Sequence, residues 1–325
     1  MRRGWIAAAL IAAFGFASPA AALDKVTFRL NWVLYGFHTP FYLGLERGYY
    51  RDEGIDLTIG EGQGSVRAVQ TVGAKGDTFG LADGGSVING VARGAPVRAV
   101  MAVTNSSPYT LTGRSDIGIK TLKDFEGRTI ASAPGEAGLA LLPALFQRNG
   151  VDMSKVKILR VEGAGKMVAI AEKRADGIMG GLDNQSLTLA AQGIPIVDFG
   201  YAKYGVNTVG LTIVANDELT KSNPDLVRRF VKATVRSFEA ALKEPEASIK
   251  AGQKIKPDLE TDLSMAQLRT GFGLMKSEAT KELPTGTFAL KDWQDTEELM
   301  RKYQDLQTDK QPTDFFSNDF LPKPM

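Results

Sequence analysis

Two segments, far apart in the chain, repeat the same order of chemical features. The first spans Gly54 to Gly85 and the second spans Gly150 to Asn184. Each begins with glycine, an apolar residue and aspartate, continues through a strand-like stretch, and reaches the motif Glu-Gly-x-Gly, at 61–64 and at 162–165. Apolar residues at helical spacing follow, and then an aspartate and a second strand-like stretch. Strands that alternate with helices in this order indicate parallel βαβ units.

The residues before each segment correspond as well. FRLNWV (28–33) precedes a loop and a helical pattern over 40–54, and GRTIASA (127–133) precedes a loop and a helical pattern over 136–150. Each half therefore reads β-loop-α-β-EGxG-α-β. This order predicts an α/β fold with two lobes of similar architecture.

The rest of the chain is assigned around these two halves. After residue 217 the pattern is that of amphipathic helices, with Ser222 or Asn223 as a cap and Pro224 at the first helical position, and we expect these helices to pack on the first lobe. Two connections, 100–114 and 204–217, combine β-branched residues with small turn formers, as hinge crossings between lobes would. The predicted division is 23–113 together with 211–325 for the first lobe and 114–210 for the second.

Four glycine-rich turns follow predicted strands: YGFHTP, GQGS, DGGS and PGEAG. In open α/β sheets, ligands bind outside the carboxyl ends of the strands, beside helix N-termini with unpaired N–H groups. One such turn is equally consistent with a simple helix cap, but four of them in two facing lobes favour a shared cleft. The polar residues on these turns, and the first residue of the second connection, are candidate ligand contacts: Gln63, Ser65, Asp83, Ser86, Glu136 and Tyr204.

The chain has one histidine, His38, and no cysteine. The sequence has no G-x-S-x-G turn to support a Ser-His-Asp triad. It also has no second histidine and no cysteine that could complete a metal site with His38. Phosphate-loop and calcium-loop motifs are absent, and GEGQGSV lacks the third glycine of the dinucleotide motif. Paired carboxylates of the glycosidase kind remain open. We therefore predict a binding protein rather than an enzyme, with no cofactor and no metal, and keep a secreted hydrolase as an alternative.

An aromatic-rich stretch surrounds this histidine. Asn31, Trp32, Tyr35 and His38 follow the first predicted strand closely, and a ligand site needs a stacking surface with a few polar groups. We predict these four residues as ligand contacts, with a hydrogen-bonded structural role as the alternative for His38 and core packing as the alternative for Trp32. For Tyr49 and Tyr50 we expect core packing.

The N-terminal residues and the balance of charges indicate in which compartment the protein works and which partners it binds. Residues 1–22 combine two arginines, an apolar run too short to span a membrane and small residues before Ala22, as in a cleaved export signal. Without Arg2 and Arg3 the chain has 37 basic and 37 acidic residues, and no basic tract occurs. We therefore expect a periplasmic monomer, with secretion as an alternative, and no nucleic-acid partner.

Four stretches carry a family resemblance: LNWVLYGFHTPFYLGLERGYYRDEGIDLTI, TLKDFEGRTI, ADGIMGG and NPDLVRRFVKAT. The sequence resembles solute-binding proteins of ABC importers, and most of all the thiamine-pyrimidine-precursor binders within the alkanesulfonate, taurine and nitrate group. The resemblance implies a type II periplasmic-binding fold with two lobes, two hinge crossings, a ligand cleft and a permease partner in the inner membrane. It also places Asn31, Trp32 and His38 at the pocket. In the second lobe Asn184 matches the N-x-E pattern of this branch, but Ser186 replaces the acid.

The ligand implied by the resemblance is a small planar N-heterocycle such as a thiamine pyrimidine precursor. Asp183 or Glu162 would then have to supply the missing acceptor. The alternative ligand is an alkanesulfonate, taurine, nitrate or carboxylate, held at helix N-termini near Ser65, Ser86 and Gly135 with the help of Arg114. A sensor subunit remains a further alternative. The resemblance also raises an enzyme alternative, a pyrimidine synthase like the fungal ones of the same fold. It implies that those enzymes consume their own active-site histidine and need a cysteine-rich iron-binding segment, and this chain has no cysteine.

Overall fold

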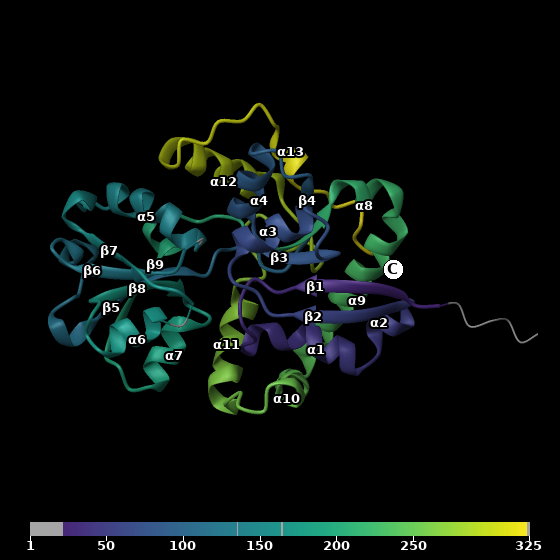
Figure 1. Ribbon diagram of the computed structural model, residues 1–325, viewed down its shortest axis with the longest axis horizontal. Helices are drawn as coiled ribbons and strands as arrows, with labels where there is room; N and C mark the ends of the chain where they lie inside the picture. The colour runs from purple at the N-terminus through teal and green to yellow at the C-terminus, as the bar shows by residue number, and fades with distance from the viewer. Residues whose placement is uncertain (1–21, 135, 164, 324–325) are drawn as a thin grey trace, which may run out of the picture.

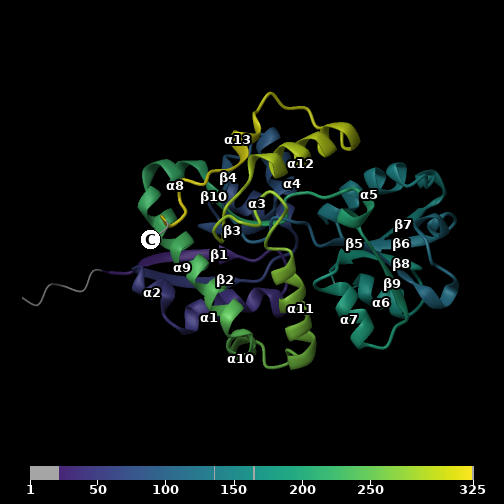
Figure 2. The same cartoon turned by 180° about the vertical axis from the view of Figure 1, so that it is seen from behind.

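The computed structural model describes residues 22–134, 136–163 and 165–323, so the predicted export signal, except for its last residue, and Gly135 lie outside the described residues. Figures 1 and 2 show two lobes side by side, each built on its own sheet with helices on both faces. Within the described residues both sheets have five strands. The predicted fold class is therefore confirmed.

The first sheet has the order β2-β1-β3-β10-β4. Strands β1 and β2 run parallel, β1 and β3 run parallel, and β10 is antiparallel to both of its neighbours. Its strands are β1 (Asp24–Arg29), β2 (Ile55–Gly60), β3 (Phe79–Asp83), β4 (Val97–Ala102) and β10 (Leu211–Asn216).

The second sheet repeats this arrangement in the order β7-β6-β8-β5-β9. Strand β6 runs parallel to β7 and β8, while β5 is antiparallel to β8 and β9. Its strands are β5 (Tyr109–Arg114), β6 (Thr129–Ser132), β7 (Lys157–Arg160), β8 (Gly177–Gly181) and β9 (Ile196–Gly200). The repeated βαβ units predicted around the two Glu-Gly-x-Gly motifs are thus present, one in each sheet.

The two crossings between the lobes, residues 103–108 and 205–210, run side by side. Leu211 N donates to Thr104 Oγ1 over 2.7 Å, and Val103 N donates to Leu211 O over 2.8 Å. At Gly210 an added Cβ would lie 2.1 Å from Thr104 Oγ1 and 2.4 Å from Ser106 O, so this close approach requires glycine. Strand β5 belongs to the second sheet, and the first crossing therefore ends at residue 108, earlier than the predicted boundary after residue 113.

Helices cover both faces of each sheet. In the first lobe they are α1 (Thr39–Glu46), α2 (Tyr49–Asp52), α3 (Ser65–Gly73), α4 (Gly84–Ala92), α8 (Asp217–Ser222), α9 (Pro224–Lys243), α10 (Pro245–Ile255), α11 (Thr261–Gly273), α12 (Leu290–Tyr303) and α13 (Pro312–Phe315). In the second lobe they are α5 (Ala137–Arg148), α6 (Gly165–Ala171) and α7 (Gln185–Ala191). No helix of the described residues is long and apolar enough to cross a membrane.

The larger of two apolar clusters in the first lobe lies between its sheet and helices α1 and α9. Phe79 on β3 stacks on Phe230 of α9, with ring centroids 4.0 Å apart. Tyr50 is buried in the same core, as predicted, and Tyr49 packs against its edge. Helix α9 begins as predicted, because Asn223 accepts a hydrogen bond from Leu226 N and a proline occupies the first position.

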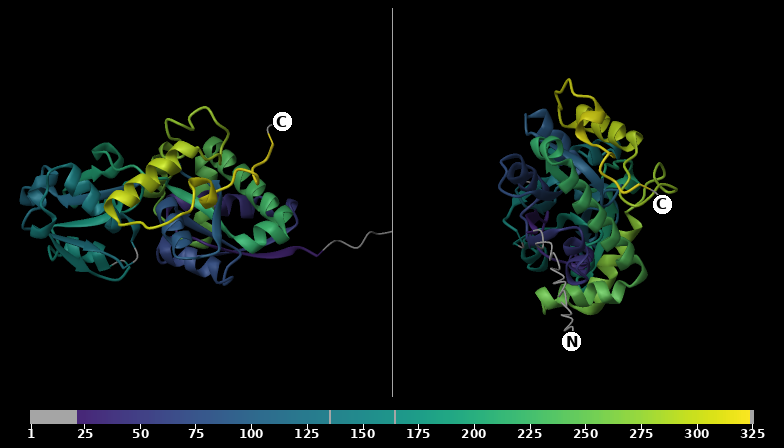
Figure 3. Two further views of the ribbon diagram at one scale, coloured as in Figure 1. Left: turned by 90° about the horizontal axis from the view of Figure 1, so that it is seen from above. Right: turned by 90° about the vertical axis from the view of Figure 1, so that its right-hand side faces the viewer.

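Helix α12 belongs to the first lobe in sequence but reaches the second. Leu299 and Tyr303 pack into the apolar core of the second lobe, where Arg148 Nε donates to the Tyr303 hydroxyl over 3.2 Å. Figure 3 shows this helix lying along the top of the molecule towards the second lobe. The lobes therefore share a third contact besides the two crossings.

Candidate functional site

Three cavities adjoin between the two sheets, within the part of the chain that the structure describes. We name them the central chamber, about 90 Å³, the Gln63 chamber, about 740 Å³, and the Arg93 chamber, about 770 Å³. Trp32 and Asn184 line both the central and the Gln63 chamber, and Glu136 lines both the central and the Arg93 chamber. The parallel strands of both sheets end at these cavities, where ligands of α/β proteins bind.

Asn31 and Trp32 reach the central chamber from the loop after β1. This loop is held against the first Glu-Gly-x-Gly loop, because Gly62 N donates to Trp32 O and Gly64 N donates to Asn31 O. A Cβ on Gly62 would lie 1.8 Å from Leu30 O, so only glycine allows the two loops to approach this closely. Trp32 is half-buried and lines two chambers, and its role as a stacking surface for a ligand stays a prediction.

His38 does not contact the cleft. It is fully buried behind Tyr35, with ring centroids 4.3 Å apart, and its Nε2 lies 3.0 Å from Asn31 Oδ1. Burial lowers the pKa of His38 to about 3, and the Val33 carbonyl offsets only part of that effect. The residue is therefore neutral and orients Asn31, so the expected ligand contact is wrong and the structural alternative holds.

Tyr35 and Asp183 join the two lobes across the central chamber. The Tyr35 hydroxyl donates to Asp183 Oδ2 over 2.7 Å, and both side chains are buried. Burial raises the pKa of Asp183 to about 6, although the bond from Tyr35 acts in the opposite direction. Burial and the neighbouring carboxylate both raise the pKa of Tyr35. Asp183 forms no ion pair among the described residues, so it can accept a hydrogen bond from a ligand.

A second contact between the lobes passes through α11. Gln267 Oε1 accepts from Gly36 N over 2.9 Å, and its Nε2 lies 3.4 Å from both Asn184 Oδ1 and Thr188 Oγ1. Asn184, predicted as a contact, thus lines the cleft and also faces the first lobe. Figure 2 shows α11 beside α7, where these residues meet.

A buried ion pair forms the floor beneath Trp32. Lys166 is 1% exposed, and its Nζ contacts Glu136 Oε1, donates to Met179 O over 2.8 Å, and lies 5.4 Å from the centroid of the Trp32 ring. Glu136 Oε2 accepts from the Ser132 hydroxyl over 2.9 Å. Glu136 was predicted as a site residue, but Lys166 was not. The sequence did contain a clue to Lys166, because it lies in the first turn of a predicted helix, where the helix dipole disfavours a positive charge.

The predicted contacts at the end of β3 form a connected group. Asp83 accepts from Ser86 N over 2.9 Å and from Ser86 Oγ over 2.6 Å, and its own N–H donates to Ser65 Oγ. Ser65 lines the central chamber, whereas Asp83 and Ser86 line the Arg93 chamber. Burial and the Asp83 carboxylate raise the pKa of Tyr109, which faces Asp83 from the second lobe. Gln63 lies in the chamber that bears its name.

Two of the remaining expectations, for Tyr204 and Arg114, are corrected. Tyr204 lines none of the three chambers, because its ring packs on Phe199 within the second lobe. Arg114 is buried and held by Asp116 through two bonds of 2.9 and 2.7 Å, so it is not free for an anion. Ser186 turns away from the cleft and donates to Asp198.

A family model of the NMT1/THI5-like proteins matches residues 36–248, more than half of the chain. The chain belongs to this family. Among curated relatives, the riboflavin-binding protein RibY of Chloroflexus aurantiacus is 26% identical over 321 residues, which cover 94% of this chain and 91% of RibY. The 4-amino-5-hydroxymethyl-2-methylpyrimidine phosphate synthase THI11 of Saccharomyces cerevisiae is 27% identical over 267 residues, 78% of each chain.

Among solved structures, the alkanesulfonate-binding protein SsuA of Xanthomonas axonopodis pv. citri, bound to MOPS, matches with a TM-score of 0.71. Its sequence is 13% identical, and the match covers 92% of this chain and 99% of SsuA. The NMT1/THI5-like chain therefore has the periplasmic-binding-protein fold, which confirms the resemblance stated from the sequence.

Proposed function

We propose that this chain is the solute-binding subunit of an ABC importer and binds a small planar N-heterocycle, such as a thiamine pyrimidine precursor or a related aromatic solute. One observation carries the proposal: the half-buried ring of Trp32 and the buried carboxylate of Asp183 line the same chamber between the lobes. A flat ring stacks on the first, and its amino or ring N–H groups donate to the second.

The environment of these two residues supports a heterocycle. Lys166 lies on one side of Trp32, so the indole is fixed in place by a cation contact while the ring also lines the chambers. Asp183 supplies a carboxylate that can accept hydrogen bonds from the ligand. In the pyrimidine branch the resemblance places this acidic residue at the position that Ser186 occupies here. Asn31, held by His38, adds an amide beside Trp32.

The relatives are consistent with this ligand class. One is named for binding riboflavin and the other for making a pyrimidine phosphate, and both names refer to planar N-heterocycles. The central chamber is small, but it shares lining residues with chambers of about 740 and 770 Å³, which are within the usual range of about 300–1,000 Å³ for ligand sites.

Binding and delivery follow from the lobe geometry. The bond between Tyr35 and Asp183 and the contacts of Gln267 are made only when the lobes meet, so a ligand between the sheets favours the closed form. Closure then presents a surface composed of both lobes to a membrane permease. This role fits the predicted export to the periplasm.

The synthase activity of the fungal relatives is not proposed for this chain. According to the family resemblance those enzymes consume an active-site histidine, whereas His38 is fully buried outside the chambers, and the chain has no cysteine for an iron-binding segment. The alternative ligand, a sulfonate or carboxylate anion, was expected to bind Arg114. Arg114 is already paired with Asp116 and is not free for that role.

A ligand panel tests the proposal. Native mass spectrometry of freshly purified protein and thermal-shift measurements would compare 4-amino-5-hydroxymethyl-2-methylpyrimidine, riboflavin, taurine and an alkanesulfonate, since a bound ligand raises the unfolding midpoint. We expect a heterocycle to bind and Trp32→Ala to abolish this binding while the variant remains folded. Binding of the sulfonates alone, or unchanged heterocycle affinity in Trp32→Ala, would refute the proposal. Co-purification with a receptor rather than a permease would indicate the sensor alternative.

A further inference from the structure

The central chamber is lined by carboxylates and aromatic rings. Its walls include Glu136 and Asp183, and among the described residues no lysine, arginine or histidine lines it. Two arginines of the cleft, Arg93 and Arg160, line the adjoining Arg93 chamber instead. The place between the lobes where a single ring fits therefore has its own charge, which is negative.

Only one of these two carboxylates is neutralised by a cation. Glu136 contacts the ammonium group of Lys166, so this pair carries no net charge. Asp183 is 3% exposed and forms no ion pair in the part of the chain that the structure describes. Because its pKa is about 6, its carboxyl group is mostly ionised at neutral pH. A buried charge without a counter-charge is unfavourable, so a cation beside Asp183 would stabilise the closed form.

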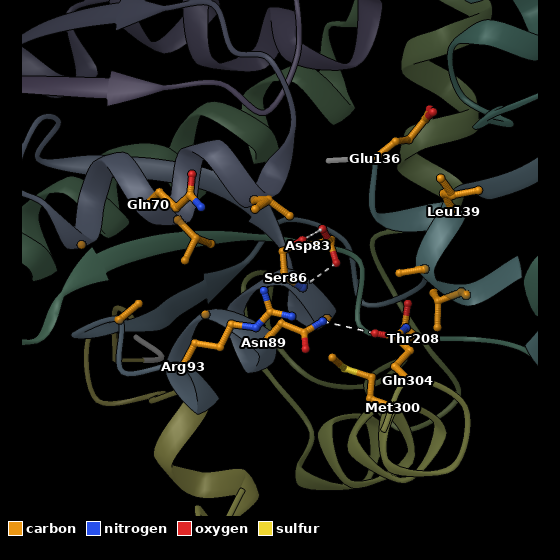
Figure 4. A pocket seen from close by; sticks show the side chains of 18 of the residues that line it. Gln70, Asp83, Ser86, Asn89, Arg93, Glu136, Leu139, Thr208, Met300 and Gln304 are labelled. Atoms are coloured by element: carbon orange, nitrogen blue, oxygen red, sulfur yellow. Dashed lines mark hydrogen bonds between the residues drawn. The ribbon is translucent and has the colours of Figure 1, made fainter. Parts of the chain in front are cut away.

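A third carboxylate approaches the central chamber from the first lobe. Asp83 accepts two hydrogen bonds from Ser86, and no cation pairs with it within the described ranges. Figure 4 shows these two bonds beside the Arg93 chamber, with Glu136 on the opposite side. Burial and the Asp83 carboxylate raise the pKa of Tyr109, which lines the central chamber. Carboxylates thus face the bound ring from both lobes.

The aromatic residues of the central chamber also favour a positive charge. Trp32, Tyr35 and Tyr109 line it, and the faces of aromatic rings attract cations. The Tyr35 hydroxyl donates its hydrogen to Asp183, so this residue has only its ring and its oxygen lone pairs left for a ligand. Lys166 already lies 5.4 Å from the centroid of the Trp32 ring. The two tyrosines are therefore the rings that remain for the charge of a ligand.

We propose that the central chamber selects a positively charged heterocycle, one that is protonated or alkylated at a ring nitrogen, and that Asp183 is its counter-ion. The ring stacks on Trp32, and its charge lies towards Asp183, Tyr35 and Tyr109. Since Asp183 belongs to the second lobe and Trp32 and Tyr35 belong to the first, the cation favours closure of the lobes. The inference rests on the proposed function and narrows its ligand class to cations.

The test compares two pairs of compounds by titration calorimetry near neutral pH. The pairs are 4-amino-1-methylpyridinium with 4-methylaniline, and 1-methylnicotinamide with 3-methylbenzamide. The two members of a pair have the same shape, but only the first is a cation. In at least one pair we expect the cation to bind at least about tenfold tighter than its neutral isostere, and added salt to reduce this preference. The pyrimidine of the ligand panel is titrated alongside, to report on the proposed function itself.

Two variants locate the preference. Asp183→Asn keeps the shape of the side chain and an oxygen that accepts from Tyr35, and it is expected to bind both members of a pair equally. Glu172→Gln is the matched control, because Glu172 is a 58% exposed carboxylate of the second lobe that lines none of the three chambers. It removes the same formal charge and should retain the full preference.

The outcomes separate this inference from the proposed function. If the pyrimidine binds but neither cation binds tighter than its isostere, the inference is wrong and the proposed function stands. The inference is also wrong if Asp183→Asn keeps the preference, or if Glu172→Gln loses it as fully as Asp183→Asn does. If none of these compounds binds, the proposed ligand class fails, and this inference fails with it.

Discussion

Replacing Tyr35 by phenylalanine removes one hydroxyl and keeps the buried ring. That hydroxyl donates to the carboxylate of Asp183 over 2.7 Å, and the two residues belong to different lobes. A hydrogen bond to a charged group contributes about 1.5–3 kcal/mol. Loss of about 2 kcal/mol from the closed form corresponds to a roughly 30-fold weaker ligand affinity near neutral pH.

The effect of Tyr35→Phe should depend on pH. Since the pKa of Asp183 is about 6 in the closed form, its carboxyl group is mostly protonated at about pH 5. A bond between neutral groups contributes only about 1 kcal/mol, so the loss in affinity should shrink to roughly fivefold. Calorimetric titration with the best ligand of the panel, at both pH values, measures the two ratios.

Tyr50→Phe is the control for Tyr35→Phe. Tyr50 is also buried, and its hydroxyl lies 3.3 Å from Thr234 Oγ1, but both residues belong to the first lobe and neither lines the cleft. This variant should change stability without changing affinity. If Tyr35→Phe binds the ligand as tightly as the wild type, or loses the same affinity at both pH values, the bond between Tyr35 and Asp183 does not stabilise the closed form.

Three further predictions concern stability. Because burial raises the pKa of Asp183 to about 6, the folded protein binds this proton more tightly than the unfolded chain. The stabilisation is therefore fully present below about pH 4 and is lost as the pH rises through 6. The unfolding midpoint of the wild type should fall relative to that of Asp183→Asn between about pH 4 and 6 and then level off, and parallel curves would contradict this. Lys166→Met leaves the Glu136 carboxylate without its cation and should cost about 3–5 kcal/mol in urea unfolding, with partial recovery when Glu136→Gln is added. Gly210→Ala forces a Cβ against Ser106 O and should destabilise by about 1–3 kcal/mol, which a lowered thermal midpoint would report.

The sheets could be predicted because their signals are local. Glycine turns, apolar strands and helix caps lie within a few residues of each other, so the order β-loop-α-β-EGxG-α-β and the cap at Asn223 were readable. The placement of β5 was not, because its partners are distant: Leu111 pairs with Met179 on one side and with Phe199 on the other. Strand pairing over such separations leaves no mark in a short window of sequence.

The candidate site could also be predicted only where its signals are local. Trp32 follows β1 and Asp83 ends β3, and the general rule for α/β sheets places the carboxyl ends of such strands at the cleft. His38 follows the same strand, but its burial depends on packing by residues far along the chain, such as Gln267, which holds the neighbouring Gly36 N. Lys166 corresponds to Ser65 in the repeated motif, and only the folded structure brings it to Glu136.

The exchange of strands between the lobes has a consequence for how the chain folds after synthesis. Strand β10 lies between β3 and β4, so β4 is attached to the first sheet only through a strand that follows the whole second lobe. The first sheet therefore cannot be completed until residue 216 is available, and a fragment that ends before residue 211 lacks its inner strand. Because long-range pairing is slow to form, the first sheet is completed late in the folding of the chain.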